Sequence, residues 1–192
     1  MRWLRNRFEA FADRLIMRAL SREPDFIIGG KDNPYLLRWY LVPWRIWHRQ
    51  ARENPTLWRR VKGFLGLVLP SVYLHCFLRS DDDRALHDHP WFWCSILLRG
   101  GYTEHTIARG GIHHRRERRA PSMKVSSPWR AHRVELFEIP GAPWVCSPTW
   151  TLFITGPRFR EWGFHCPNGW VPWRKFTAAD DPGSIGRGCG EG

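Results

Sequence analysis

The segment that decides the fold is DDDRALHDHPWFWCSILLRGGYTEH, residues 81–105. It places His87 and His89 one residue apart, immediately before an aromatic and apolar run typical of a strand. Side chains at positions i and i+2 of a strand point to the same face, so both imidazoles can reach one ion. Pro90 lacks a backbone N–H and indicates that a strand ends there. The segment therefore predicts β-structure with two potential metal ligands at a strand end.

Short strand-like segments continue on both sides of this stretch. Clusters of Gly, Pro, Asp and Ser separate them, and this spacing is typical of an all-β sandwich or barrel. The candidates are residues 25–30, 35–43, 71–80, 92–99, 102–107, 124–127, 133–138, 150–155, 162–166 and 170–176. Gly100 and Gly101 are expected to form a two-residue hairpin turn between the strands that flank them.

Two regions carry helical periodicity instead. Residues 1–22 repeat apolar side chains every three or four positions between arginines, which predicts an amphipathic helix packed on the domain. A helix lying on a membrane or on phosphates is the other interpretation. Residues 44–69 predict a helical insertion. We therefore expect residues 1–70 to pack on a barrel core at 71–176, with a flexible C-terminal tail at 177–192.

The composition is that of one globular domain. The chain has 192 residues, of which 43% are hydrophobic and 25% are charged. These values exclude a largely disordered chain, a fibre and a disulfide-dense mini-protein. The formal net charge of +12 raises the question of nucleic-acid binding.

Cysteine usage and apolar runs predict a cytoplasmic protein. The five cysteines are widely spaced, odd in number and contain no C-x-x-C pair, which favours free thiols in a reducing compartment. The N-terminal segment has no apolar core of the kind that a signal peptide carries. The longest apolar stretch, residues 63–70, is far too short to span a membrane.

A basic segment, GGIHHRRERR at residues 110–119, is the strongest local indication of nucleic-acid binding. Four arginines in a predicted loop could contact phosphates: Arg115, Arg116, Arg118 and Arg119. The favoured interpretation is a solvated loop, because the arginines of this chain are dispersed along its whole length. No helix-turn-helix, RNP-like or zinc-finger pattern is present in the sequence.

A third histidine completes a candidate metal site. His132 lies in SSPWRAHRVEL, residues 126–136, at the start of a predicted strand. Imidazole is the commonest metal ligand in proteins. Three imidazoles leave coordination positions free for water or substrate, as in catalytic sites. The alternative is a histidine cluster held by ordinary hydrogen bonds.

The order of these motifs resembles the two-motif pattern of the cupin superfamily over residues 71–156. In that pattern His87 and His89 match the first motif, Gly100 or Gly101 its closing glycine, and His132 the second motif. The whole stretch through TLFITGPRFREWGFHCPNGWVPW, ending at residue 173, also resembles an uncharacterised branch met in phage and prophage contexts. The resemblance implies a single cupin-type jelly-roll barrel in which the three histidines bind one divalent metal.

The sequence departs from the cupin pattern at one ligand. Trp93 and Cys94 stand where cupins commonly carry a metal-binding glutamate. Across the expected hairpin, Glu104 would face Leu97, about 13 Å along the strand from the ligand position, which is too far for coordination. A neutral three-histidine site resembles the cupins that use ferrous iron to oxidise thiols. Zinc and nickel also suit imidazole, and a decayed site is the alternative.

Five further residues are expected to line a pocket beside the metal: His75, Trp93, Tyr102, Glu104 and Phe153. The favoured function is a metal-dependent cupin acting on a small molecule inside the barrel, with ferrous dioxygenase-like chemistry as the specific hypothesis and catalysis itself left open. The alternatives are a non-catalytic jelly roll that binds a small molecule, sugar or nucleotide, and a nucleic-acid-associated basic protein. A homodimer is an expectation from the resemblance alone.

Overall fold

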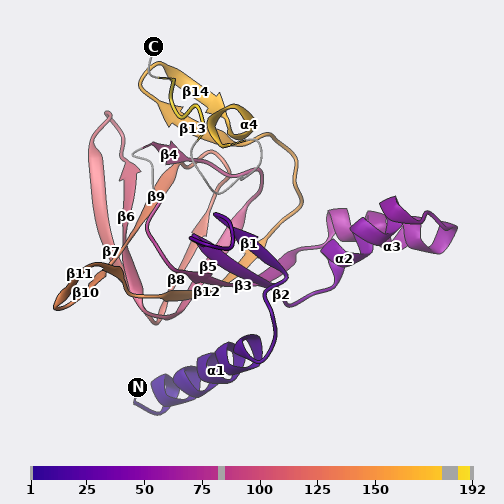
Figure 1. Ribbon diagram of the computed structural model, residues 1–192, viewed down its shortest axis with the longest axis horizontal. Helices are drawn as coiled ribbons and strands as arrows, with labels where there is room; N and C mark the ends of the chain where they lie inside the picture. The colour runs from indigo at the N-terminus through magenta and orange to yellow at the C-terminus, as the bar shows by residue number, and fades with distance from the viewer. Residues whose placement is uncertain (1, 82–84, 179–185, 191–192) are drawn as a thin grey trace.

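The computed structural model describes residues 2–81, 85–178 and 186–190 (Figure 1). Its helices are α1 (Arg2–Leu20), α2 (Trp44–Glu53), α3 (Leu57–Val68) and α4 (Trp173–Phe176). Its first strands are β1 (Phe26–Ile28), β2 (Leu36–Tyr40), β3 (Ser71–Phe77), β4 (Leu86–His87), β5 (Trp93–Arg99), β6 (Gly101–Ile107) and β7 (His113–Arg119). The remaining strands are β8 (Ser122–Ser126), β9 (His132–Leu136), β10 (Glu138–Ile139), β11 (Ala142–Cys146), β12 (Thr149–Thr155), β13 (Gly163–Cys166) and β14 (Gly169–Pro172).

Two six-stranded sheets form the body of the protein. One has the order β1-β2-β3-β12-β5-β8 and the other the order β14-β13-β4-β9-β6-β7, while β10 and β11 form a separate hairpin. Within the described residues no strand of one sheet pairs with a strand of the other. The expected β-rich fold is confirmed, but the expected single barrel is corrected, because the two sheets are not closed into one barrel and remain separate hydrogen-bonded units.

The turn at Gly100 carries the chain from one sheet to the other. Gly100 has φ +80°, and a Cβ there would lie 2.8 Å from the Pro148 carbonyl oxygen, so the turn requires glycine. Strand β5 pairs with β12 and β8, whereas β6 pairs with β7 and β9. The expected hairpin between β5 and β6 is therefore wrong. Glu104 lies opposite Val134 and Arg116 instead of Leu97.

Two further local expectations are corrected. The predicted basic loop at 115–119 belongs to strand β7, and residues 173–176 form the short helix α4. Strand β7 is made of His, Arg and Glu, which have low intrinsic strand preference, and its pairing with β6 determines its conformation. Charged residues are common on edge strands because they discourage pairing with other chains.

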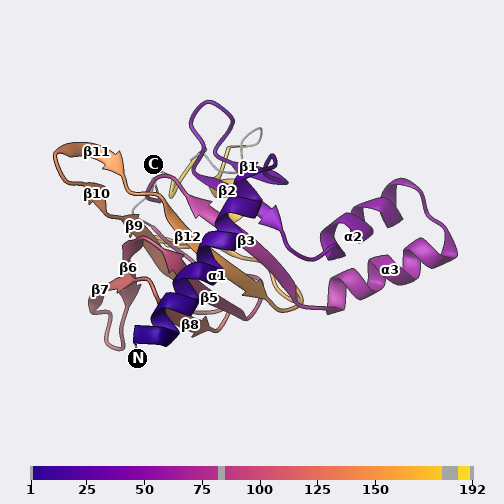
Figure 2. The ribbon, with the colours of Figure 1, turned by 90° about the horizontal axis from the view of Figure 1, so that it is seen from below.

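Helix α1 packs across the first sheet, as the favoured interpretation of the sequence expected (Figure 2). Its buried residues join a hydrophobic cluster with strands β2, β3, β5 and β12: Ala12, Ile16, Ala19, Trp39, Leu74, Cys76, Leu98 and Trp150. Trp39 and Trp150 stack with their ring centroids 5.5 Å apart. A smaller cluster, formed by Leu97, Tyr102, Val134 and Leu136, joins β5 to β6 and β9 of the other sheet.

The expected helical insertion is present as a pair of helices, α2 and α3, between β2 and β3. Thr56 caps α3 by accepting a hydrogen bond from the Arg59 backbone N–H. Among the described helices, none has the length and apolarity needed to cross a membrane.

The expectation of free thiols is wrong for two of the five cysteines. Cys166 and Cys189 form a disulfide, whereas Cys76, Cys94 and Cys146 are free. The pair is 23 residues apart in sequence, and spacing alone does not show which thiols meet in space. The backbone N–H groups of residues 186 and 188 also donate to the Phe176 carbonyl. Residues 179–185 and 191–192 of the predicted tail lie outside the described residues.

Candidate metal centre

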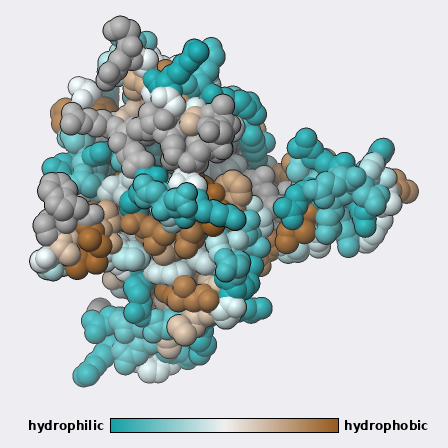
Figure 3. Space-filling model, in the orientation of Figure 1, coloured by the Kyte–Doolittle hydropathy of each residue, from teal (hydrophilic) through white to brown (hydrophobic). Residues whose placement is uncertain are grey.

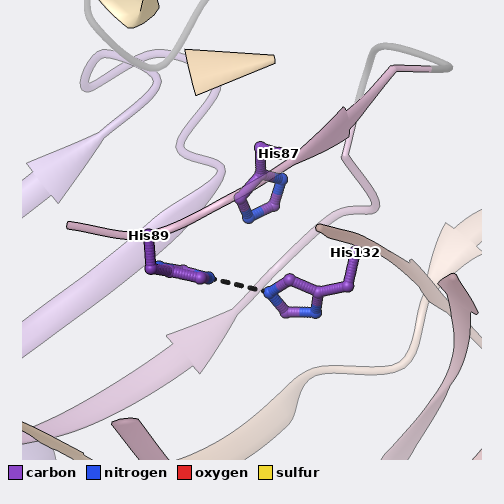
Figure 4. Close-up of side chains that lie close together, drawn as sticks. All are labelled: His87, His89 and His132. Atoms are coloured by element: carbon purple, nitrogen blue, oxygen red, sulfur yellow. Dashed lines mark hydrogen bonds between the residues drawn. The ribbon is translucent and has the colours of Figure 1, made fainter. Parts of the chain in front are cut away.

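The three predicted ligands lie together at the junction of β4 and β9 (Figure 4). His87 ends β4 and pairs directly with His132, the first residue of β9, while His89 follows two residues after His87. One ring nitrogen from each residue lies within 4.8 Å of the others. The Nε2 atoms of His89 and His132 are 2.8 Å apart. The strand pairing thus brings together histidines that are distant in sequence.

This set of donors fits a divalent metal. Metal–nitrogen bonds of about 2.1 Å hold neighbouring ligands roughly 3–3.5 Å apart, so small rotations of the three rings would bring them to one ion. Imidazole suits iron, zinc and nickel, and three ligands leave positions open for substrate. Metal binding at this cluster remains a prediction.

Glu104 orients His132 from behind. Its Oε1 atom lies 3.1 Å from Nδ1 of His132, and its side chain is buried. A carboxylate accepts this hydrogen bond, so Nδ1 carries the proton and the Nε2 lone pair faces the cluster. In the metal-free protein His89 Nε2 therefore donates to His132 Nε2. This arrangement is the usual support for a metal-binding histidine.

Two cations neutralise the buried Glu104 carboxylate. Arg118 Nε donates a hydrogen bond to Oε2 at 2.9 Å. Lys124, whose side chain is also buried, donates a hydrogen bond from Nζ to Oε1. Burial alone would raise the pKa of Glu104, but the hydrogen bond from His132, together with the charge and hydrogen bond of Lys124, holds this pKa far below its ordinary value. Glu104 is therefore ionised across the physiological range.

The imidazoles of His87 and His89 are neutral at pH 7. Burial, opposed by the Asp81 carboxylate, lowers the pKa of His87 to about 4. Burial and the neighbouring His132 and His87 hold the pKa of His89 well below its ordinary value. Because metals bind the neutral imidazole, no proton has to be removed from a charged ring before an ion enters.

Lowering the pH from 7 to 5 is expected to destabilise the metal-free protein by about 2 kcal/mol through His87 alone. The folded-state pKa of His87 is about 4, and in the unfolded chain it returns to about 6.5. Between these values the unfolded state binds more protons, so stability falls as pH falls. Urea titrations at pH 5, 6 and 7 measure this dependence. His87→Gln should show a shallower slope, and equal slopes would contradict the assignment.

A cavity of about 410 Å³ opens beside the three histidines and is walled mainly by aromatic side chains. Four of the predicted pocket residues line it: His75, Trp93, Tyr102 and Phe153. Glu104 does not line the cavity, because it lies behind His132. Residues of both sheets contribute to the wall, so the cavity lies between the sheets.

The cavity wall also holds polar groups of defined orientation. Arg38 Nε donates to His75 Nε2 at 2.9 Å, and the His75 ring stacks on Phe153 with centroids 5.1 Å apart. Burial and the charge of Arg38 hold the pKa of His75 well below its ordinary value, so His75 is neutral and can accept this bond. Trp93 Nε1 and Thr151 Oγ1 are buried without a hydrogen-bond partner in the described part of the chain. A polar small molecule in the cavity could satisfy such groups.

Sequence reasoning missed Asp88, which lies between the two histidines of the first motif. Strand alternation turns its side chain to the opposite face, where it is buried. It accepts hydrogen bonds from the Gly163 backbone N–H at 2.9 Å and from Trp170 Nε1 at 3.1 Å, and it pairs with Arg160 at 3.1 Å. Asp88 thus ties the histidine segment to β13 and β14. The alternation rule that grouped the histidines could have identified it.

Sequence reasoning did not place Asp81 beside the histidines, but its side chain packs against the cluster. The Asp81 carboxylate accepts a hydrogen bond from the Tyr35 hydroxyl and another, at 2.7 Å, from the Val134 backbone N–H. It also lies 3.8 Å from His87 Nδ1. These contacts place a carboxylate beside Nδ1 of His87. The acidic run at the start of the quoted segment was the available signal.

The four arginines of the basic segment have different environments. Arg118 turns inward and pairs with Glu104, so it is removed from any phosphate-binding surface. Arg115 and Arg119 are exposed and lie near Glu135 and Glu117, and Arg116 is exposed as well. The ion pair of Arg118 with Glu104 therefore divides the cluster that appeared continuous in the sequence.

No protein-family model and no curated protein matches the chain. Solved cupin-fold structures are similar to it. One is an oxalate decarboxylase studied for a reaction-specificity switch, at 13% identity and TM-score 0.45, covering 76% of this chain and 30% of that chain. Another is Bacillus subtilis oxalate decarboxylase with Mn(II) centres, at 16% identity and TM-score 0.42, covering 77% of this chain and 31% of that chain. A third is Fe(II)-HppE with an alternative substrate, at 11% identity and TM-score 0.40, covering 70% of this chain and 58% of that chain. The chain spans about a third of the length of the two oxalate decarboxylases.

Proposed function

We propose that this chain is a cupin-type, metal-dependent enzyme that acts on a small molecule in the cavity between its sheets. The observation that carries the proposal is the convergence of three imidazoles, those of His87, His89 and His132, on one point at the wall of that cavity. Ferrous iron is the metal we propose, and zinc, nickel and manganese are the alternatives that the test includes. The phage-associated branch of the superfamily remains part of this proposal.

The chain's own residues prepare the site in three ways. Glu104 fixes the orientation and the tautomer of the His132 ring. The aromatic wall, which includes Trp93 and Phe153, gives the cavity a mainly apolar lining. The absence of a carboxylate among the three clustered ligands leaves the full charge of a bound ion available to a substrate. These features favour binding of a polar or anionic group next to the metal.

The specific reaction that we propose is oxidation of a small thiol by dioxygen. When bound, ferrous iron supplies the dioxygen chemistry. Both oxygen atoms are added to sulfur and the thiol becomes a sulfinic acid, so dioxygen itself takes up the electrons and no further reductant is required. Cavity size limits the substrate to a small molecule.

Oxygen consumption tests this proposal. Untagged protein is stripped of metal, reloaded with Fe(II), Mn(II), Ni(II) or Zn(II), and mixed with cysteine, cysteamine or 3-mercaptopropionate. We expect uptake with Fe(II) and at least one thiol, and its loss in His132→Ala. Thiol binding without oxygen uptake would instead support a non-catalytic binding protein. Equal uptake by wild type and His132→Ala would contradict the proposal.

A further inference from the structure

The helices α2 and α3 form a hairpin that projects from the body of the protein (Figures 1 and 2). Their extensive contacts are with each other, and neither packs extensively on another described helix or strand. The hairpin therefore adds little to the core of the two sheets. Packing on the sheets therefore does not account for the apolar residues that the hairpin exposes, among them Leu57 and Phe64.

The hairpin holds itself together through a glycine-lined contact on one side of α3. A Cβ on Gly63 would lie 2.6 Å from the Ala51 Cβ, and a Cβ on Gly66 would lie 2.6 Å from the Trp44 carbonyl oxygen. Both glycines are buried. Larger side chains would separate the helices, so this side of α3 is the one that packs against α2.

The opposite side of α3 is apolar and exposed. Residues Leu57, Val61, Phe64 and Val68 recur at intervals of four and three positions and form one stripe along the helix, which we call the apolar face. Their exposed fractions are 82%, 42%, 62% and 44%. An exposed contiguous apolar stripe on a protein marks an interaction site.

The α2–α3 hairpin is rich in basic and aromatic residues. The sequence between residues 44 and 69 contains one acidic residue, Glu53, and six basic residues: Arg45, Arg49, Arg52, Arg59, Arg60 and Lys62. Lys62 Nζ lies 5.1 Å from the ring centroid of Trp47 and 5.4 Å from that of Trp58. The side of the hairpin turned to the viewer in Figure 3 is mostly hydrophilic, with hydrophobic residues at its margins.

The charge of the hairpin decides between possible partners. A second copy of this chain would bring the same basic hairpin and a formal charge of +12, so like charges would oppose self-association through this surface. An anionic phospholipid surface offers negative headgroups above an apolar layer. A helix with an apolar stripe, flanking Trp and Arg or Lys side chains matches that layering.

We propose that the α2–α3 hairpin docks this protein on anionic phospholipid surfaces, with the apolar face of α3 at the boundary between headgroups and acyl chains. The basic side chains contact the headgroups, and the cavity between the sheets stays outside the bilayer. This docking is independent of the proposed function, because no residue of the hairpin belongs to the metal cluster or to the cavity wall.

Vesicle co-sedimentation of the full chain tests the proposal. The probes are phosphatidylcholine vesicles with and without 30% phosphatidylglycerol. We expect binding to the anionic vesicles, weakening at 0.5 M salt, and at least a tenfold loss of partitioning for Leu57→Glu with Phe64→Glu. Leu57→Glu alone, at the most exposed position, is a second variant with the same expected direction and less risk to folding.

The matched control replaces two apolar residues of similar exposure on strand β8, Met123→Glu with Val125→Glu. It changes the net charge equally and should bind anionic vesicles within twofold of wild type. Failure of the wild-type protein to bind anionic vesicles would overturn the proposal, as would equal loss in the control. Self-association that the apolar-face variants abolish, without vesicle binding, would overturn it in favour of a second copy.

Discussion

Replacing Glu104 by glutamine is expected to lower the free energy of unfolding by about 3–5 kcal/mol. The carboxylate is buried and lies against Arg118, Lys124 and His132. Removing it leaves two buried cations without their counter-charge, and burying an unpaired charge is far more costly than losing a surface ion pair. Urea denaturation at pH 7 measures the change.

Lys124→Met provides the matched comparison for this prediction. It removes one buried cation but leaves Glu104 paired with Arg118, so the expected loss is smaller, about 1–2 kcal/mol. The contribution of Glu104 also has a defined pH dependence. Its pKa is lowered in the folded state, so the stabilisation is present above its ordinary value of 4.5 and is lost as pH falls below it. Equal losses in the two variants would contradict the account of the buried cluster.

Substituting alanine for any one of the three clustered histidines is expected to weaken divalent metal binding at least about 100-fold, a larger effect than the loss of a residue that only supports a ligand. Each of His87, His89 and His132 contributes one of three converging nitrogens. Titration of metal-stripped, untagged protein with Co(II), followed by its visible absorption, measures the affinity.

His113→Ala is the control for the metal titration. It also removes an imidazole, but this imidazole is exposed on β7 and is not part of the cluster. It contacts His105 of β6. Its affinity for Co(II) should stay within threefold of wild type. Equal weakening by His113→Ala, or unchanged affinity in the cluster variants, would place the bound ion elsewhere.

The strands and the clustering of the three histidines were predictable from local sequence because they depend on local rules. Alternation groups His87 with His89, and the apolar runs of β3, β5 and β12 are typical of buried strands. The packed N-terminal helix followed from periodicity for the same reason. The charged strand β7 was missed, because its pairing with β6 determines its conformation rather than its composition.

Contacts between distant segments could not be predicted. The position of Glu104 behind His132 depends on Gly100 carrying the chain between sheets, whereas the local glycine pair is equally compatible with a hairpin within one sheet. The Cys166–Cys189 disulfide depends on where the C-terminal segment folds back. The outward apolar face of α3 has the same periodicity as a helix packed on a core, so only the structure distinguishes the two.

The most direct test of the metal site is anomalous X-ray scattering from crystals of untagged protein grown with Fe(II) or Co(II), with data collected above and below the metal absorption edge. The site predicts one strong anomalous peak about 2.0–2.2 Å from a ring nitrogen of each of His87, His89 and His132. Crystals with no peak at the cluster, in which His89 and His132 stay hydrogen-bonded to each other, would contradict it.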